Sequence, residues 1–242
     1  MDVPVGVREA MDPVLALLAS DPTAPSAVTD VSRAWLAHVA DSLTGLRIGP
    51  LRRAARIADV GSGAGFPGLA LAAALPDARV DLIEAIGRKC AFMRRALAAS
   101  ALANASVVQA RAEEWAARPP PDGGREAYEA VTARAVGRLA TLAELASPLL
   151  VDGGILVAWK GRRREEEELE LERAASRLAM EPVEIVQVGP DAGSRHRHLH
   201  VARKCGPTPE GLPRRPGMAK KRPFGRAASR AAQGGRGAAA RR

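Results

Sequence analysis

The chain has 242 residues, of which 47% are hydrophobic and 26% are charged. These proportions are ordinary for a globular protein with a substantial core, and they exclude a fibrous or wholly disordered chain. No apolar run approaches the roughly 18 residues that a membrane-spanning helix needs, and no secretory signal follows Met1. Cys90 and Cys205 form neither a disulfide framework nor a metal-type motif. We therefore expect a cytoplasmic protein without membrane or metal partners.

The net charge of +9 is concentrated near the C-terminus. Residues 203–242 contain 12 of the 36 Lys and Arg but only one of the 27 Asp and Glu, so the rest of the chain is close to neutral. A near-neutral body with a cationic tail is typical of a catalytic or binding domain that also contacts a polyanion. The alternative is a disordered extension without a specific partner.

The first predicted elements are helices. Residues 11–20 and 30–43 carry apolar side chains at helical spacing, and in the second helix every fourth residue from Val31 to Leu43 forms one apolar stripe. A stripe of this kind requires a partner surface. Residues 1–55 are therefore predicted to be an N-terminal helical segment that packs on the domain after it.

From residue 56 the pattern changes to short apolar strands that alternate with helices. Strands are predicted at 56–60, 79–84, 106–109, 128–134 and 154–160. Alternation of this kind predicts a mainly parallel sheet with helices on both faces. A charged helix over 162–180 follows, with a solvated face and Arg–Glu pairs four residues apart.

An antiparallel pair of strands, 183–188 and 196–204, is predicted to close the main domain, which spans residues 56–204. Residues 205–224 are predicted to be a basic arm. The Ala-, Gly- and Arg-rich extension at 225–242 is predicted to be disordered.

The most informative segment is 59–68 (Asp-Val-Gly-Ser-Gly-Ala-Gly-Phe-Pro-Gly), where a predicted strand meets a helix. Gly61, Gly63 and Gly65 allow the main chain to approach a ligand closely, because side chains would collide there. Phe66 occupies the last glycine position of the dinucleotide fingerprint Gly-x-Gly-x-x-Gly, which disfavours a pyrophosphate ligand. The plain alternative is a tight strand-to-helix turn.

Two acids accompany this turn. Asp59 ends the first strand, and Glu84 ends the next strand 25 residues later, where a carboxylate can accept both hydroxyls of a ribose. S-adenosylmethionine offers a ribose but no pyrophosphate, and its sulfonium favours acidic surroundings. The combination favours S-adenosylmethionine over a nicotinamide cofactor, although Glu84 alone would be interpreted as a solvated strand-end acid.

The run 59–68 resembles the signature of the RsmG family, also called glucose-inhibited division protein B. Its members are S-adenosylmethionine-dependent 7-methylguanosine methyltransferases of 16S ribosomal RNA. Further stretches match the family pattern: His38-x-x-Asp41-Ser42-Leu43, residues 131–136 (Val-Thr-Ala-Arg-Ala-Val), residues 158–161 (Ala-Trp-Lys-Gly) and the basic segment 213–223. The resemblance covers roughly residues 30–224.

The resemblance implies a class I methyltransferase fold, which is an α/β fold with a mostly parallel seven-stranded sheet, N-terminal helices and a basic C-terminal tail. It implies that Gly61 and Phe66 contact the cofactor and that Ala112 and Glu113 flank its adenine. It also places Arg134 beside the methyl-transfer site. The segment around His38, Asp41 and Ser42 is a candidate for shaping that site, because the N-terminal helices must pack near the carboxyl edge of the sheet.

Methyl transfer to guanine N7 needs no general base, because the N7 lone pair is free at neutral pH. The enzyme has mainly to align the reacting atoms. The candidate catalytic residues are Arg134, which would hold a carbonyl oxygen or a phosphate, and Lys160, which would reach a phosphate or the base O6. The alternatives are a salt bridge between Arg134 and an acid such as Asp59, and an ordinary solvated lysine at residue 160.

The candidate RNA-binding residues are cations, because polyphosphate affinity is largely electrostatic. They are Arg197, Arg214, Arg215, Lys220, Lys221 and Arg222. The predicted partner is 16S rRNA in the small ribosomal subunit, and the protein is expected to be a monomer. Three other functions stay open: a methyltransferase of small molecules, a non-catalytic RNA-binding assembly factor, and a nicotinamide-dependent dehydrogenase.

Overall fold

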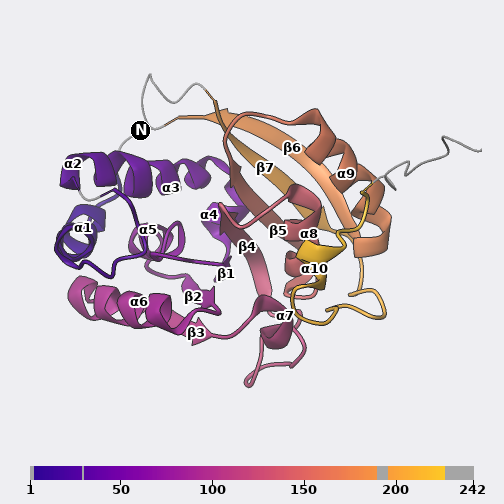
Figure 1. The fold of residues 1–242 in the computed structure, drawn as a ribbon, viewed down its shortest axis with the longest axis horizontal. Helices are drawn as coiled ribbons and strands as arrows, with labels where there is room; N and C mark the ends of the chain where they lie inside the picture. Colours follow the sequence, from indigo (N-terminus) through magenta and orange to yellow (C-terminus); the bar gives the residue numbers. More distant parts are fainter. Residues whose placement is uncertain (1–2, 29, 190–195, 227–242) are drawn as a thin grey trace, which may run out of the picture.

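A seven-stranded sheet forms the centre of the computed structural model, which describes residues 3–28, 30–189 and 196–226 (Figure 1). The strands are β1 (Arg56–Val60), β2 (Arg79–Glu84), β3 (Ala105–Gln109), β4 (Tyr128–Arg134), β5 (Leu150–Lys160), β6 (Met180–Val188) and β7 (Arg197–Lys204). Their order is β3-β2-β1-β4-β5-β7-β6. Strands β1 to β5 pair in parallel, and β7 is antiparallel to both β5 and β6. The predicted sheet is confirmed.

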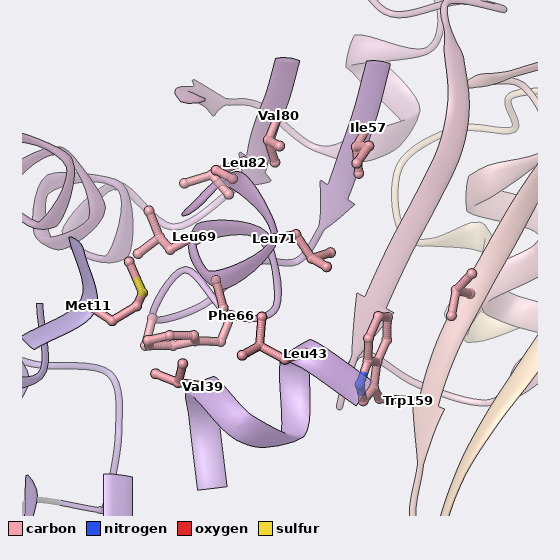
Figure 2. Packing of buried hydrophobic residues seen from close by; sticks show 14 of the residues in the cluster. Met11, Val39, Leu43, Ile57, Phe66, Leu69, Leu71, Val80, Leu82 and Trp159 are labelled. Carbon is pink, nitrogen blue, oxygen red and sulfur yellow. The ribbon is translucent and has the colours of Figure 1, made fainter. Parts of the chain in front are cut away.

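Helices cover both faces of this sheet (Figure 1). One face carries α1 (Val7–Ser20), α5 (Gly68–Ala74) and α6 (Gly87–Ser100), and the other carries α7 (Ala112–Trp115), α8 (Leu139–Ala146) and α9 (Glu165–Ala175). Strand β1 shows the cause, because successive side chains of a strand point to opposite faces. Ile57 packs in the first core, where Figure 2 shows it near Leu71, and Ala58 packs in the second.

The N-terminal segment continues through α2 (Val31–Ala34), a π-helix (Trp35–Ala40), α3 (Asp41–Leu43), a 3-10 turn (Thr44–Arg47) and α4 (Gly49–Arg53). The helix predicted over 30–43 is confirmed, although its middle part, Trp35–Ala40, is π-helical. The predicted apolar stripe is buried only toward its C-terminal end, where Val39 and Leu43 belong to the core. Leu43 is fully buried, whereas Val31 is 46% exposed.

The charged helix is also shorter than predicted, because α9 begins at Glu165, after the three arginines. Its acids do not all lie on a solvated face: Glu167 and Glu170 are 5% and 2% exposed. Cations from neighbouring loops compensate them, since Arg138 Nε donates to Glu170 at 2.7 Å. None of the helices in the described part of the chain has the length and apolar surface that crossing a bilayer requires.

The segment after β7 folds back across α8 and includes α10 (Met218–Lys221), drawn in yellow beside α8 in Figure 1. Thr141 of α8 donates to the carbonyl oxygen of Ala219, at 3.2 Å. Gly225 packs so closely on α9 that a Cβ there would collide with the Glu170 carbonyl. Of the extension predicted to be disordered, residues 227–242 lie outside the described residues.

Candidate active site at the carboxyl edge of the sheet

The glycine turn connects β1 to α5 at the point where the strand order reverses, which is where ligands bind in open α/β sheets. Gly61, Gly63 and Gly65 all have positive φ angles, of 68°, 61° and 94°. A Cβ at Gly61 would lie 2.7 Å from Cγ2 of Val136, and a Cβ at Gly65 would collide with Leu69. The turn therefore requires glycine both for its conformation and for its close neighbours.

The side chain of Asp59 stabilises the glycine turn through hydrogen bonds. Its side chain is fully buried, Oδ2 accepts a hydrogen bond from the Gly68 amide at 3.2 Å, and Oδ1 accepts one from the Thr132 hydroxyl at 2.9 Å. Burial raises the pKa of Asp59 to about 6, although these hydrogen bonds oppose the shift. Asp59 thus ties the start of α5 to β4 and exposes no surface of its own.

The raised pKa of Asp59 gives a stability prediction. Between its ordinary pKa of 3.8 and about 6, the folded protein binds a proton that the unfolded chain has released. The contribution of Asp59 to stability is therefore fully present below about pH 4 and is lost as the pH rises through 6, on the order of 3 kcal/mol in total. The free energy of unfolding of the wild type, minus that of D59N, should fall by this amount as the pH rises through 6. Unfolding in urea at several pH values measures both free energies. A difference that is independent of pH would contradict the assignment.

Glu84 lies against the turn, as its spacing predicts. It is 7% exposed, Oε2 accepts from the Gly63 amide at 3.2 Å, and Oε1 accepts from the Ile86 amide at 2.9 Å. The turn contains no Lys or Arg that could neutralise a pyrophosphate. Side-chain-free backbone beside a strand-end carboxylate therefore fits the ribose and the cationic amino-acid part of S-adenosylmethionine.

Phe66 is 4% exposed and belongs to the core. Figure 2 shows its ring between Met11, Val39 and Leu43, so it packs against the N-terminal helices. The His38 ring stacks on it with centroids 5.1 Å apart, and Arg134 Cζ lies 5.8 Å from the ring centroid. Phe66 thus joins the glycine turn to the residue expected beside the methyl-transfer site.

Arg134, at the end of β4, pairs with Asp41 and not with Asp59. Nη1 donates to Asp41 Oδ2 and to the Ala37 carbonyl oxygen, both at 3.0 Å, and Nη2 donates to His38 Nδ1 at 3.3 Å. Burial and then the Arg134 charge lower the pKa of His38 to about 4. His38 is therefore neutral near pH 7, and because its Nδ1 accepts, its Nε2 donates to Ser26 Oγ at 3.0 Å.

Lys160, at the end of β5, is not a solvated lysine. Its side chain is 20% exposed, Nζ donates to the Gly137 carbonyl oxygen at 2.8 Å, and an ion pair joins it to Glu167 at 2.6 Å. Nothing in the sequence indicates this pair, because the charge pattern predicts a solvated face for Glu167. Lys160 lies at the rim of the site, beside the loop that follows Arg134.

The wall expected to flank the adenine touches the C-terminal arm. Ala112 is 7% exposed at the start of α7, and Glu113 Oε1 accepts from the Gly217 amide at 2.8 Å. Nothing in the sequence indicated this contact, which joins residues 104 positions apart. The arm therefore borders the wall at which the adenine is expected.

The expected RNA-binding cations differ in their surroundings. Arg214 is engaged within the protein: Nε and Nη2 each donate to the Glu144 carboxylate at 2.6 Å, and Glu144 is 3% exposed. Arg197 begins β7 with its side chain 45% exposed. The remaining four are exposed on the arm: Arg215, Lys220, Lys221 and Arg222.

The fold and the site define a class of protein. A sheet with one antiparallel strand, a glycine turn after β1 and an acid at the end of β2 is the architecture of class I S-adenosylmethionine-dependent methyltransferases. A SAM-dependent methyltransferase from Aquifex aeolicus superposes with a TM-score of 0.53 at 17% identity, over 72% of this chain and 94% of that one. Fibrillarin from Aeropyrum pernix, with bound S-adenosylmethionine, gives 0.52 at 16% identity, over 67% and 72%. These likenesses confirm the fold.

The family follows from sequence comparison. Residues 25–199 match the GidB family model, described as rRNA small subunit methyltransferase G. A ribosomal RNA small subunit methyltransferase G from Pelotomaculum thermopropionicum is 41% identical over 200 residues, which cover 82% of each chain. One from Rubrobacter xylanophilus is 42% identical over 192 residues, covering 78% of this chain and 72% of that one. The chain belongs to the rRNA small subunit methyltransferase G family, and the expected resemblance is confirmed.

Proposed function

We propose that this protein transfers a methyl group from S-adenosylmethionine to N7 of a guanosine in 16S ribosomal RNA. The single observation that carries the proposal is the contact between the glycine turn and the end of β4. There, Arg134 Cζ lies 5.8 Å from the centroid of the Phe66 ring. The family to which the chain belongs supports the same reaction. The reacting groups would thus meet between the ends of β1 and β4.

The cofactor-binding roles are divided among three strand ends. The main chain at Gly61, Gly63 and Gly65 binds the amino-acid part, and Glu84 accepts the ribose hydroxyls. Ala112 and Glu113 would border the adenine, while Asp59 and Phe66 hold the turn in place. S-adenosylmethionine, when bound, supplies an electrophilic methyl group and leaves as a neutral thioether.

The chain has only to orient the acceptor base, since guanine N7 needs no deprotonation. His38 is neutral near pH 7 and its ring nitrogens are already engaged by Arg134 and Ser26, which is consistent with a site that lacks a general base. Arg134 and Lys160 bind oxygen atoms of the acceptor, either the base O6 or a phosphate. Both cations then stay away from the face of a ring that becomes positively charged.

The RNA-binding surface consists of Arg197 at the rim and of Arg215, Lys220, Lys221 and Arg222 on the arm. Their exposure supports phosphate contacts. Arg214 contributes by fixing the arm through Glu144. Because one chain supplies every residue of the proposed site, we propose that the protein acts as a monomer, in the cytoplasm where ribosomes assemble.

Incubation with isotopically labelled S-adenosylmethionine tests this function. Three acceptors are offered in parallel: small ribosomal subunits lacking the modification, naked 16S rRNA and a pool of metabolites. We expect label in rRNA, supplied either as particles or free, and a much lower but measurable rate of labelling when R134A replaces the wild type. Label confined to small molecules would identify a different methyltransferase. Absence of cofactor binding would favour an assembly factor.

A further inference from the structure

The carboxylate of Asp41 lies where three adjacent strands reach the carboxyl edge of the sheet. Arg134 ends β4, Trp159 is the penultimate residue of β5, and Arg197 begins the antiparallel β7. Arg134 Nη1 is 3.0 Å from Asp41 Oδ2, and Arg197 Nε is 3.7 Å from Oδ1. Trp159 Nε1 donates to the main-chain oxygen of Asp41 at 2.9 Å. One residue of the N-terminal segment therefore contacts three strand ends.

The surrounding chain fixes Asp41 at this point. The π-helix ends immediately before it, and π-helical segments frequently occur at functional sites. Thr44 Oγ1 donates to the same main-chain oxygen at 2.6 Å. Gly45 leaves room for the indole, because a Cβ there would lie 2.5 Å from Trp159 Cζ2. The position of the carboxylate is thus determined by packing on β5 and not by its charge alone.

The two oxygens of this carboxylate are in different situations. Oδ2 is hydrogen-bonded to Arg134, whose side chain is 14% exposed. Oδ1 is buried without a hydrogen bond, because 3.7 Å is too long for one. An unsatisfied buried oxygen costs stability. Arg197, in contrast, is 45% exposed, so it can exchange this weak contact for a phosphate.

We infer that Asp41 is a positioning residue, which holds Arg134 for methyl transfer and competes with RNA phosphate for Arg197. The inference rests on the proposed function. Loss of the Asp41 charge removes the support of Arg134 but releases Arg197. Turnover should therefore fall while RNA affinity does not, a separation that a general loss of structure would not produce.

The D41N variant tests the inference, because asparagine keeps the shape and removes the charge. We expect kcat to fall about tenfold or more. The Kd for rRNA should be unchanged or lower, and the Kd for S-adenosylmethionine should stay within about twofold. The matched control is D30N: Asp30 is an exposed cap of α2 whose side chain accepts from the Arg33 amide, a role that asparagine retains. Equal kcat for D41N and wild type, or weakened rRNA binding by D41N, would overturn the inference.

A double-variant cycle separates positioning from general stabilisation. If Asp41 acts through Arg134, D41N/R134A should have the same kcat as R134A, whereas multiplied losses would overturn the inference. The protected guanidinium resonance expected for Arg134 in ¹⁵N-labelled protein should shift and exchange faster with water in D41N, and an unchanged resonance would contradict the pairing. Should D41N not fold, D41E keeps the charge and displaces it by one methylene. Lower kcat with unchanged rRNA affinity is then expected, and wild-type kcat would overturn the inference.

A methylation assay of the wild-type protein distinguishes failure of this inference from failure of the proposed function. A wild type that methylates no RNA overturns the proposed function and the inference with it. A wild type that methylates rRNA, with D41N equal to it in every assay, overturns the inference alone.

Discussion

Replacing Gly61 with alanine should weaken S-adenosylmethionine binding at least about a hundredfold, equivalent to roughly 2.7 kcal/mol, and should leave the sheet folded. The φ angle of 68° costs any residue with a Cβ about 1 to 2 kcal/mol. The new Cβ would also lie 2.7 Å from Val136 Cγ2, two residues after Arg134. Either the turn or the loop after β4 must move, and both line the proposed site. Calorimetric titration of S-adenosylmethionine measures the effect.

The matched control is Gly153→Ala. Gly153 has a similar φ angle of 78° but is exposed, and a Cβ there would meet nothing within 4 Å. This variant should lose about 1 kcal/mol of stability and bind S-adenosylmethionine as the wild type does. Wild-type affinity in G61A, or an equal loss of affinity in G153A, would show that the turn is not the binding site.

Replacing Arg214 with alanine should lower the free energy of unfolding by about 3 kcal/mol, because it leaves Glu144 charged, buried and unpaired. The guanidinium also packs 4.0 Å from the centroid of the Phe224 ring, a contact that alanine cannot make. Release of the arm should weaken rRNA binding as well. Unfolding in urea and an rRNA binding titration measure the two effects.

Arg215, the next residue, is the matched control because it is exposed. R215A should weaken rRNA binding but change stability by less than about 0.5 kcal/mol. Adding E144L to R214A should restore part of the lost stability, since the unpaired charge is then gone. If R214A were as stable as R215A, Arg214 would not anchor the arm.

Much of the fold could be predicted from the sequence because its strands are short apolar runs between clear turn signals. The predicted bounds of β1, β2 and β4 agree with the structure. The glycine turn and Glu84 could also be placed together, since parallel strands end at one edge of the sheet. Local pattern was sufficient wherever neighbouring residues determine the conformation.

The charged contacts of the site could not be predicted, because they join distant residues. Arg134 pairs with Asp41, 93 positions earlier, and Arg214 pairs with Glu144, 70 positions earlier. Periodicity likewise predicts a solvated face for Glu167. A local pattern does not show that Lys160, at the end of β5, forms an ion pair with this side chain. The motif His38-x-x-Asp41 indicated the right segment, but neither the π-helix nor the partner of Asp41.

The position of the transferred methyl group tests the central claim most directly. Small subunits that lack the modification are incubated with the protein and S-adenosylmethionine, and their 16S rRNA is digested to nucleosides for mass spectrometry. The account predicts that 7-methylguanosine appears, approaching one per rRNA, and that it forms far more slowly with G61A at the same S-adenosylmethionine concentration. A methyl group on another atom or base, or unmodified rRNA despite bound S-adenosylmethionine, would contradict it.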